Sequence, residues 1–109
     1  MNHVLKKLGL DEKEIDLYLR LLKTGPIRAS TLAYQINLPR TTVQNILLRL
    51  EKEQIVTKAL EGNVYIFAPV HPDNLIRILD IRKRETIVEF DRIADELKKI
   101  TPELVGIMY

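Results

Sequence analysis

Cysteine and tryptophan are absent from this 109-residue chain, and glycine occurs only four times. Without cysteine the chain cannot form a disulfide, a thiolate zinc site or a thiol nucleophile, which is compatible with the cytoplasm. No apolar run approaches the roughly 20 residues that span a bilayer, so we expect no membrane segment. A Gly-rich phosphate loop and a nucleophile elbow are missing as well. His3 and His71 are isolated from other ligand types, so we expect no enzyme, no metal site and no cofactor.

Acidic residues are absent from Leu17 to Leu50, although the chain contains 15 Asp and Glu against 17 Lys and Arg. The net charge is only +2, so any affinity for nucleic acid has to come from the local placement of cations. A surface that faces phosphates must lack carboxylates, because they repel the duplex. We therefore expect the acid-free stretch to contain the nucleic-acid-binding surface.

Two short helical patterns meet within this stretch, at Asn37 to Pro39. Ala29 or Ser30 begins the first helix, and the Ser30 hydroxyl is expected to cap it. Two helices joined by a turn of three or four residues form a helix-turn-helix, and its second helix is placed to enter a DNA major groove. The inward positions, at helical spacing, are Leu32, Ala33 and Ile36 in the first helix and Val43, Ile46, Leu47 and Leu50 in the second.

The outer face of the second helix carries residue types that recognise base edges. Arginine pairs with guanine, glutamine and asparagine pair with adenine, and threonine contacts phosphates or thymine methyl groups. The expected major-groove residues are Arg40, Thr41, Thr42, Gln44 and Asn45. The expected phosphate contacts are Ser30, Thr31, Arg49 and Lys58.

An alternating pattern on both sides of Glu61-Gly62-Asn63 predicts a β-hairpin from Ile55 to Ala68. Lys58 and Asn63 either approach the minor groove or backbone, as a wing does, or the hairpin only closes the core. Pro26 to Arg28 is expected to add a short third strand. The acid at the hairpin tip argues against deep insertion into a groove.

A longer helix precedes these elements. Asp11 and Glu14 have the spacing of a capping box, and the helix is expected to end near Gly25. We therefore predict a mainly α (α+β) fold, with a winged helix-turn-helix domain over residues 1–70. The expected core consists of Ile15, Tyr18, Leu19, Leu22, Leu32, Ile36, Val43, Ile46, Leu47, Leu50, Val56 and Phe67.

Residues 71–109 are expected to form a long dimerisation helix and a tail. No Gly or Pro interrupts the chain from Asp73 to Ile100, and apolar residues recur there at heptad spacing, with Lys83 and Thr86 in the middle. The helix either returns onto its own domain or pairs with a second copy of the chain. We favour a homodimer, because the apolar positions continue along the helix beyond the length that the domain can cover. Parallel and antiparallel pairing both remain open. The expected dimer seam consists of Ile76, Leu79, Phe90, Ile93, Leu97 and Ile100.

The chain resembles the N-terminal DNA-binding region of the TrmB-like family of transcriptional regulators. The resemblance rests on Leu8 to Asp11 followed by Glu14, on Leu21-Leu22 with Gly25-Pro26, and on Pro39-Arg40. It continues through the hairpin to the long helix, and winged helices of the MarR and ArsR types share its outline. The resemblance implies an archaeal or bacterial transcription factor that acts as a dimer on operator double-stranded DNA.

Two departures from the family pattern accompany this resemblance. Family members often carry a C-terminal effector domain, which binds sugar in the best-known branch; here residues 100–109 look like the entry to a following domain, so the chain is either a fragment or a minimal member. Leu48 stands where relatives usually have a polar residue. An exposed Leu48, together with the near-neutral charge, motivates an alternative function as a protein-interaction module. The effector, if any, is unknown.

Overall fold

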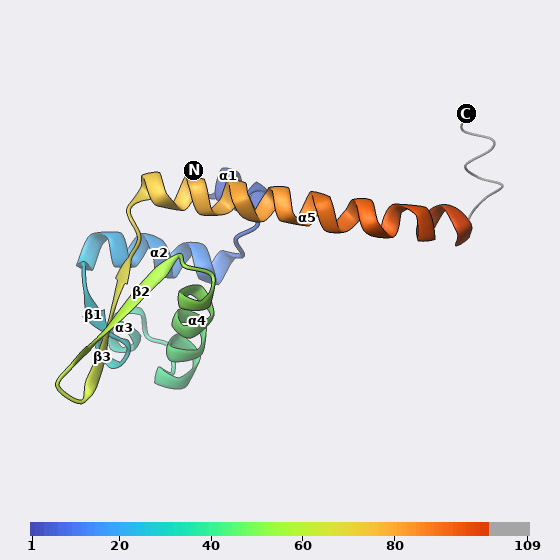
Figure 1. The fold of residues 1–109 in the computed structure, drawn as a ribbon. Helices are drawn as coiled ribbons and strands as arrows, with labels where there is room; N and C mark the ends of the chain where they lie inside the picture. Colours follow the sequence, from blue (N-terminus) through green and yellow to red (C-terminus); the bar gives the residue numbers. More distant parts are fainter. Residues whose placement is uncertain (101–109) are drawn as a thin grey trace.

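The computed structural model describes residues 1–100. In chain order the elements are α1 (Asn2–Lys7), α2 (Glu12–Thr24), β1 (Ile27–Arg28), α3 (Ala29–Ile36), α4 (Arg40–Lys52), β2 (Val56–Glu61), β3 (Val64–Pro69) and α5 (Pro72–Ile100). Figure 1 shows a small domain from which α5 projects far to one side. This arrangement is the predicted mainly helical winged helix-turn-helix with a long C-terminal helix. The expected entry to a following domain lies outside the described residues after Ile100.

The start of α2 is fixed by a capping box, as predicted. The Glu14 backbone N–H donates to Asp11 Oδ1 at 2.8 Å, and the Asp11 N–H donates to Glu14 Oε1 at 3.1 Å. Both bonds satisfy N–H groups that a helix leaves without a partner. The predicted cap of α3 is wrong, because Arg28 occupies the cap position and no side chain accepts a hydrogen bond there. Ser30 lies inside the helix instead.

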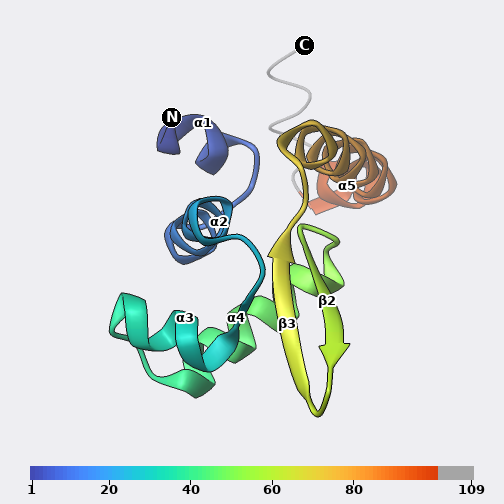
Figure 2. The same cartoon turned by 90° about the vertical axis from the view of Figure 1, so that its left-hand side faces the viewer.

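The wing is a three-stranded antiparallel sheet in the order β1-β3-β2. Ile27 pairs with Phe67 and Leu60 pairs with Tyr65 across it. The predicted third strand is therefore confirmed. Figure 2 shows the β2–β3 hairpin extending past the helices toward the same end of the domain as α3 and α4.

The core lies between α2, α3, α4, the base of the sheet and the start of α5. Its fully buried side chains include Ile15, Leu17, Leu21, Leu32, Val43, Leu47, Leu50, Ile55, Val56 and Leu79. The predicted face of α2 was partly wrong, since Leu22 is 41% exposed and Leu21 is buried in its place. Leu19 and Ile36 are only partly buried against this core. The other predicted core positions are buried.

The first turns of α5 belong to this core. Leu75 and Leu79 are buried, and the Tyr18 hydroxyl donates to the Val70 carbonyl at 2.8 Å just before the helix begins. Leu79 is 1% exposed, so its own domain covers the side chain that we expected in the dimer seam. The expected division of the chain after residue 70 stays a prediction. A search of residues 1–100 finds no helix long and apolar enough to cross a membrane.

Candidate nucleic-acid interface

A groove of about 220 Å³ lies where α3, α4 and the wing meet. Ser30 comes from the start of α3, Arg40 and Gln44 come from the first turns of α4, and Asn63 comes from the hairpin turn. Four residues that were predicted from separate parts of the sequence therefore line one concave surface. Arg28 and Tyr65 also line it.

The groove is electropositive. Arg28 and Arg40 both line it, neither forms an ion pair within the described part of the chain, and no acidic residue is among the lining residues. In addition, α3 and α4 both begin without a side-chain cap and without an acid in the first turn. The backbone N–H groups at such helix starts attract anions, so the surface is suited to phosphate.

The outer face of α4 is open to solvent along its first half. Arg40, Thr41, Gln44 and Asn45 are exposed, while Val43, Ile46 and Leu47 are buried on the opposite side. The predicted register of this helix is therefore confirmed. Thr42 is half-buried at the edge of the face. Leu48 is half-buried against the core, so the expectation of an exposed leucine is wrong.

Two of the predicted phosphate contacts lie elsewhere. Arg49 Nη2 lies 3.4 Å from Asp11 Oδ2, and its Nε lies 4.0 Å from Glu14 Oε2, so this guanidinium faces the start of α2. Lys58 Nζ lies 3.9 Å from Glu51 Oε1 and 4.9 Å from the centre of the Tyr65 ring. Both cations line a different surface, next to Leu48. Their charges are partly compensated by neighbours.

The two carboxylates at the start of α2 have shifted pKa values. The Glu14 backbone N–H stabilises the charged form and lowers the pKa of Asp11, with a smaller contribution from Arg49. Burial raises the pKa of Glu14, which is the one buried charged side chain in residues 1–100. These shifts belong to the capping box.

Sequence reasoning missed Arg28 and Tyr65. Arg28 stands directly before α3, and its strand pairs with Ile66 of β3, which brings it beside the wing. The signal was present, because Arg28 is the last cation before the first helix of the helix-turn-helix. Tyr65 was hidden because the alternating pattern of the hairpin does not show which side of the sheet lies next to α3 and α4; the structure places Tyr65 in the groove.

The apolar stripe of α5 continues after the domain ends. Its first members, Leu75 and Leu79, are buried, and the same three- and four-residue steps lead through Arg82 and Thr86 to Phe90. The later members are exposed at 44–73% and are Phe90, Ile93, Leu97 and Ile100. Ile76 lies beside the stripe and is 65% exposed.

The fold and the groove define a winged helix-turn-helix protein of the transcription-regulator class. Residues 5–73 match the family described as "Sugar-specific transcriptional regulator TrmB". The chain belongs to this family, whose members regulate transcription and are not enzymes.

Individual relatives agree with this assignment. The chain is 28% identical over 102 residues to the HTH-type sugar sensing transcriptional regulator TrmBL1 of Pyrococcus furiosus, which covers 94% of this chain and 29% of that protein. It is similar to the structure of TrmBL2, an archaeal chromatin protein, with a TM-score of 0.69 and 23% identity over 92% of this chain and 38% of the other. A possible transcriptional regulator from Methanosarcina mazei Go1 gives a TM-score of 0.62 and 23% identity, over 90% and 86% of the two chains.

Proposed function

We propose that the chain binds double-stranded DNA sequence-specifically, with the first half of α4 in the major groove. The observation that carries this proposal is the acid-free groove in which Arg28 and Arg40 lie beside the exposed Gln44, neither of them in an ion pair within residues 1–100. Arg40, Gln44 and Asn45 have side chains that form paired hydrogen bonds with guanine or adenine edges. Thr41 and Thr42 flank them and suit thymine methyl groups or phosphates.

Phosphate contacts are assigned first to Arg28, Ser30 and Thr31, which lie at the uncapped start of α3. A phosphate there would meet a guanidinium, two hydroxyls and free backbone N–H groups. Arg49 and Lys58 would first have to leave Asp11 and Glu51, so their contribution to affinity is expected to be smaller. Asn63 and Tyr65 are the proposed wing contacts.

The protein is further proposed to act as a homodimer through α5. Two half-sites about one helical turn, roughly 34 Å, apart give useful specificity. The four distal apolar side chains each contribute about 1.5–3 kcal/mol when fully buried; roughly half of Phe90, Ile93 and Leu97 is already covered, and Ile100 is still 73% exposed. The free energy of burying the eight such side chains of a dimer is therefore comparable to the association cost of about 4–15 kcal/mol. A dimer of moderate affinity is the expected result.

The alternative function, a protein-interaction module, was motivated in part by an exposed Leu48. Leu48 is half-buried, so this argument no longer applies. Binding to heparin and to mixed duplex at low salt distinguishes the two functions. A protein that binds neither favours the protein-partner account.

The decisive experiment is selection of bound duplexes from a random pool, followed by anisotropy measurements on the selected sequence. Replacing Gln44 or Asn45 with Ala is expected to weaken binding by about 1–3 kcal/mol and to relax the preference at one base pair. An Arg92→Ala variant, on the distal part of α5, serves as the control. Unchanged affinity in both Arg40→Ala and Gln44→Ala would exclude this mode of DNA binding.

A further inference from the structure

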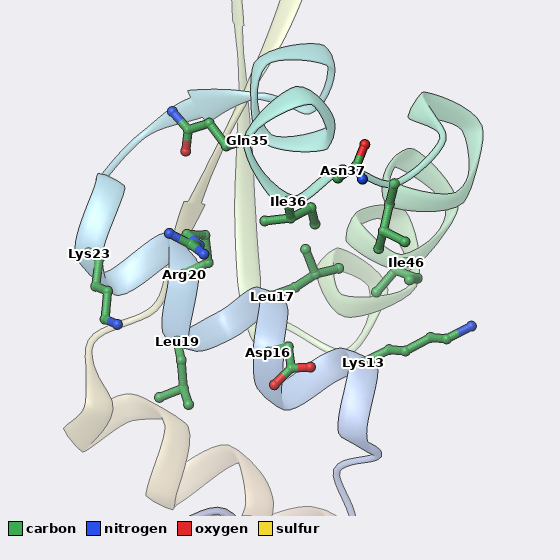
Figure 3. A pocket seen from close by; sticks show the side chains of 11 residues that line it. Lys13, Asp16, Leu17, Leu19, Arg20, Lys23, Gln35, Ile36, Asn37 and Ile46 are labelled. Atoms are coloured by element: carbon green, nitrogen blue, oxygen red, sulfur yellow. The ribbon is translucent and has the colours of Figure 1, made fainter.

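A further cavity in residues 1–100 lies away from the proposed DNA surface. It has a volume of about 610 Å³ and is bordered by one face of α2, the end of α3, the joint between α3 and α4, and Ile46 of α4. Figure 3 shows the α2 side chains along one side and Ile36, Asn37 and Ile46 across from them. Small-molecule sites in proteins commonly measure about 300–1,000 Å³ and combine apolar walls with a few convergent polar groups.

The α2 side of this cavity carries a row of three cations. Lys13, Arg20 and Lys23 all line it and all are exposed. None of the three forms an ion pair within the part of the chain that the structure describes. From the first to the last, the row is about 15 Å long at 1.5 Å per residue. Unpaired cations beside one cavity favour an anionic occupant.

One carboxylate interrupts this row. Asp16 is the only acidic residue that lines the cavity, and it lies three residues after Lys13 and seven before Lys23. It is also four residues before Arg20, so it offsets the charge of Lys13 and Arg20 more than that of Lys23. An anionic head group is best accommodated between Arg20 and Lys23, which are three residues apart on the same face of α2.

The rest of the lining is apolar. Leu17 and Ile46 reach the cavity from the core, where they are 2% and 5% exposed, and Ile36 is half-buried. Leu38 lines the cavity from the joint between α3 and α4 and is 40% exposed. An apolar body lying against Ile36 and Leu38 would remove their exposed surface from water, which is favourable in proportion to the area covered.

We propose that this cavity binds a small organic anion with an apolar body, such as a medium-chain or aromatic carboxylate. The carboxylate lies between Arg20 and Lys23, and the apolar body extends past Ile36 toward Leu38. This site is separate from the groove of Arg28 and Arg40 and from the distal face of α5. The occupant touches α2 and the joint that precedes the recognition helix, so it is placed to change the angle between α2 and α4.

The inference can be tested without DNA, so its failure is distinguishable from failure of the proposed function. The full chain, labelled with ¹⁵N, is titrated with decanoate below its micelle concentration and, separately, with decanol. We expect decanoate to shift the amide signals of α2 and of residues 35–38. Decanol, which lacks the charge, is expected to bind at least about tenfold more weakly.

A double variant, Arg20→Gln with Lys23→Gln, is expected to weaken decanoate binding by about tenfold or more. The matched control is Lys83→Gln with Arg92→Gln, which removes two exposed cations from α5, and this control is expected to bind decanoate like the unchanged chain. Both variants replace surface residues, and thermal melting curves of the unlabelled proteins verify that they fold. Three outcomes would overturn the proposal: signal shifts confined to α5, equal binding of decanoate and decanol, or unchanged binding in the Arg20→Gln, Lys23→Gln variant.

Discussion

Arg82 of α5 donates a hydrogen bond from Nη2 to Oε2 of Glu53, the residue that ends α4, over 2.9 Å. Both side chains are partly buried. The pair joins the proposed recognition helix directly to the proposed dimerisation helix. The angle between these helices sets the spacing of two half-sites in a dimer, so this contact bears on which operator geometry the protein accepts.

Replacing Arg82 with Gln is therefore expected to affect DNA binding more than stability. The free energy of unfolding should fall by less than about 1 kcal/mol, because the pair is partly solvated. Affinity for a duplex with two correctly spaced half-sites should fall, while affinity for a single half-site should change little. Anisotropy titrations with the two duplexes measure the difference. Arg84→Gln is the control, since Arg84 pairs with Asp80 within the same helix at 2.8 Å; an equal loss in both variants would contradict the role of Arg82.

Replacing Arg28 with Gln tests the proposed phosphate contact that sequence reasoning missed. Affinity should fall for specific and unrelated duplexes alike, because a phosphate contact carries no sequence information. The slope of log affinity against log salt concentration should become shallower by about one. Titrations at four salt concentrations give the slope. A variant whose slope matches that of the unchanged chain would show that Arg28 does not meet the backbone.

Introducing charge on the distal face of α5 should separate the proposed dimer. Phe90→Asp with Ile93→Asp removes four apolar side chains per dimer, each contributing roughly 0.8–1.5 kcal/mol, so the dissociation constant should rise by at least about 100-fold. Sedimentation velocity over a concentration series measures this constant.

A matched control lies on the other side of the same helix. Ile81 and Val88 are exposed at 49% and 53%, close to the 55% and 47% of Phe90 and Ile93. Ile81→Asp with Val88→Asp should leave the dimer intact, because this face points away from the stripe. An unchanged chain that sediments as a monomer at tens of micromolar, or equal dissociation by both double variants, would contradict the proposed seam.

Gly25 ends α2 with φ 74° and ψ −163°, a conformation that is essentially restricted to glycine. A Cβ atom at this position would meet nothing within 4 Å, so the expected penalty is backbone strain alone. Gly25→Ala should lower the free energy of unfolding by about 1–3 kcal/mol. Urea denaturation followed by circular dichroism measures it. A loss below a few tenths of a kcal/mol would mean that the joint between α2 and β1 relaxes without strain.

Replacing Glu14 with Gln tests how the buried carboxylate at the start of α2 affects the pH dependence of stability. Burial raises the pKa of Glu14 above its ordinary value, so the folded state holds the proton more tightly than the unfolded state. The stabilisation that comes from this proton is present below the unfolded pKa and is lost as pH rises through the folded pKa. Gln keeps an oxygen that accepts the Asp11 N–H and carries no charge.

The advantage of Glu14→Gln over the unchanged chain should therefore grow as pH rises from 4 toward neutrality. Asp11 acts in the opposite sense, because its lowered pKa gives stability that is lost in acid. Thermal melts at several pH values measure the difference. A constant difference across this range would mean that Glu14 titrates alike in both states.

Several elements were predictable because residues close together in the sequence specify them. The capping box of Asp11 and Glu14 fixes the start of α2, and the run without Gly or Pro after Pro72 predicts α5 over Pro72–Ile100. The register of α4 followed from one apolar stripe opposite a polar face. These signals depend on residues within one or two turns, so no distant contact was needed to interpret them.

The buried face of α2 was not predictable in the same way. Between Ile15 and Leu22 apolar side chains surround most of the helix, so helical spacing does not distinguish Leu21 from Leu22. Contacts of α2 with α1, α4 and β3 decide which of them is buried. The early part of α5 shows the same limit, because the heptad pattern is identical where Leu79 packs in its own domain and where Phe90 lies exposed.

The sequence by itself determined the class of fold and the exposed polar face of α4, because these follow from local periodicity and composition. Only the tertiary structure decided that Arg28, Arg40 and Tyr65 line one groove, and that Arg49 faces Asp11. The physical reason is distance along the chain: strand pairing and helix packing bring these groups together, and no pattern of neighbouring residues encodes which distant charge a long, flexible side chain will meet.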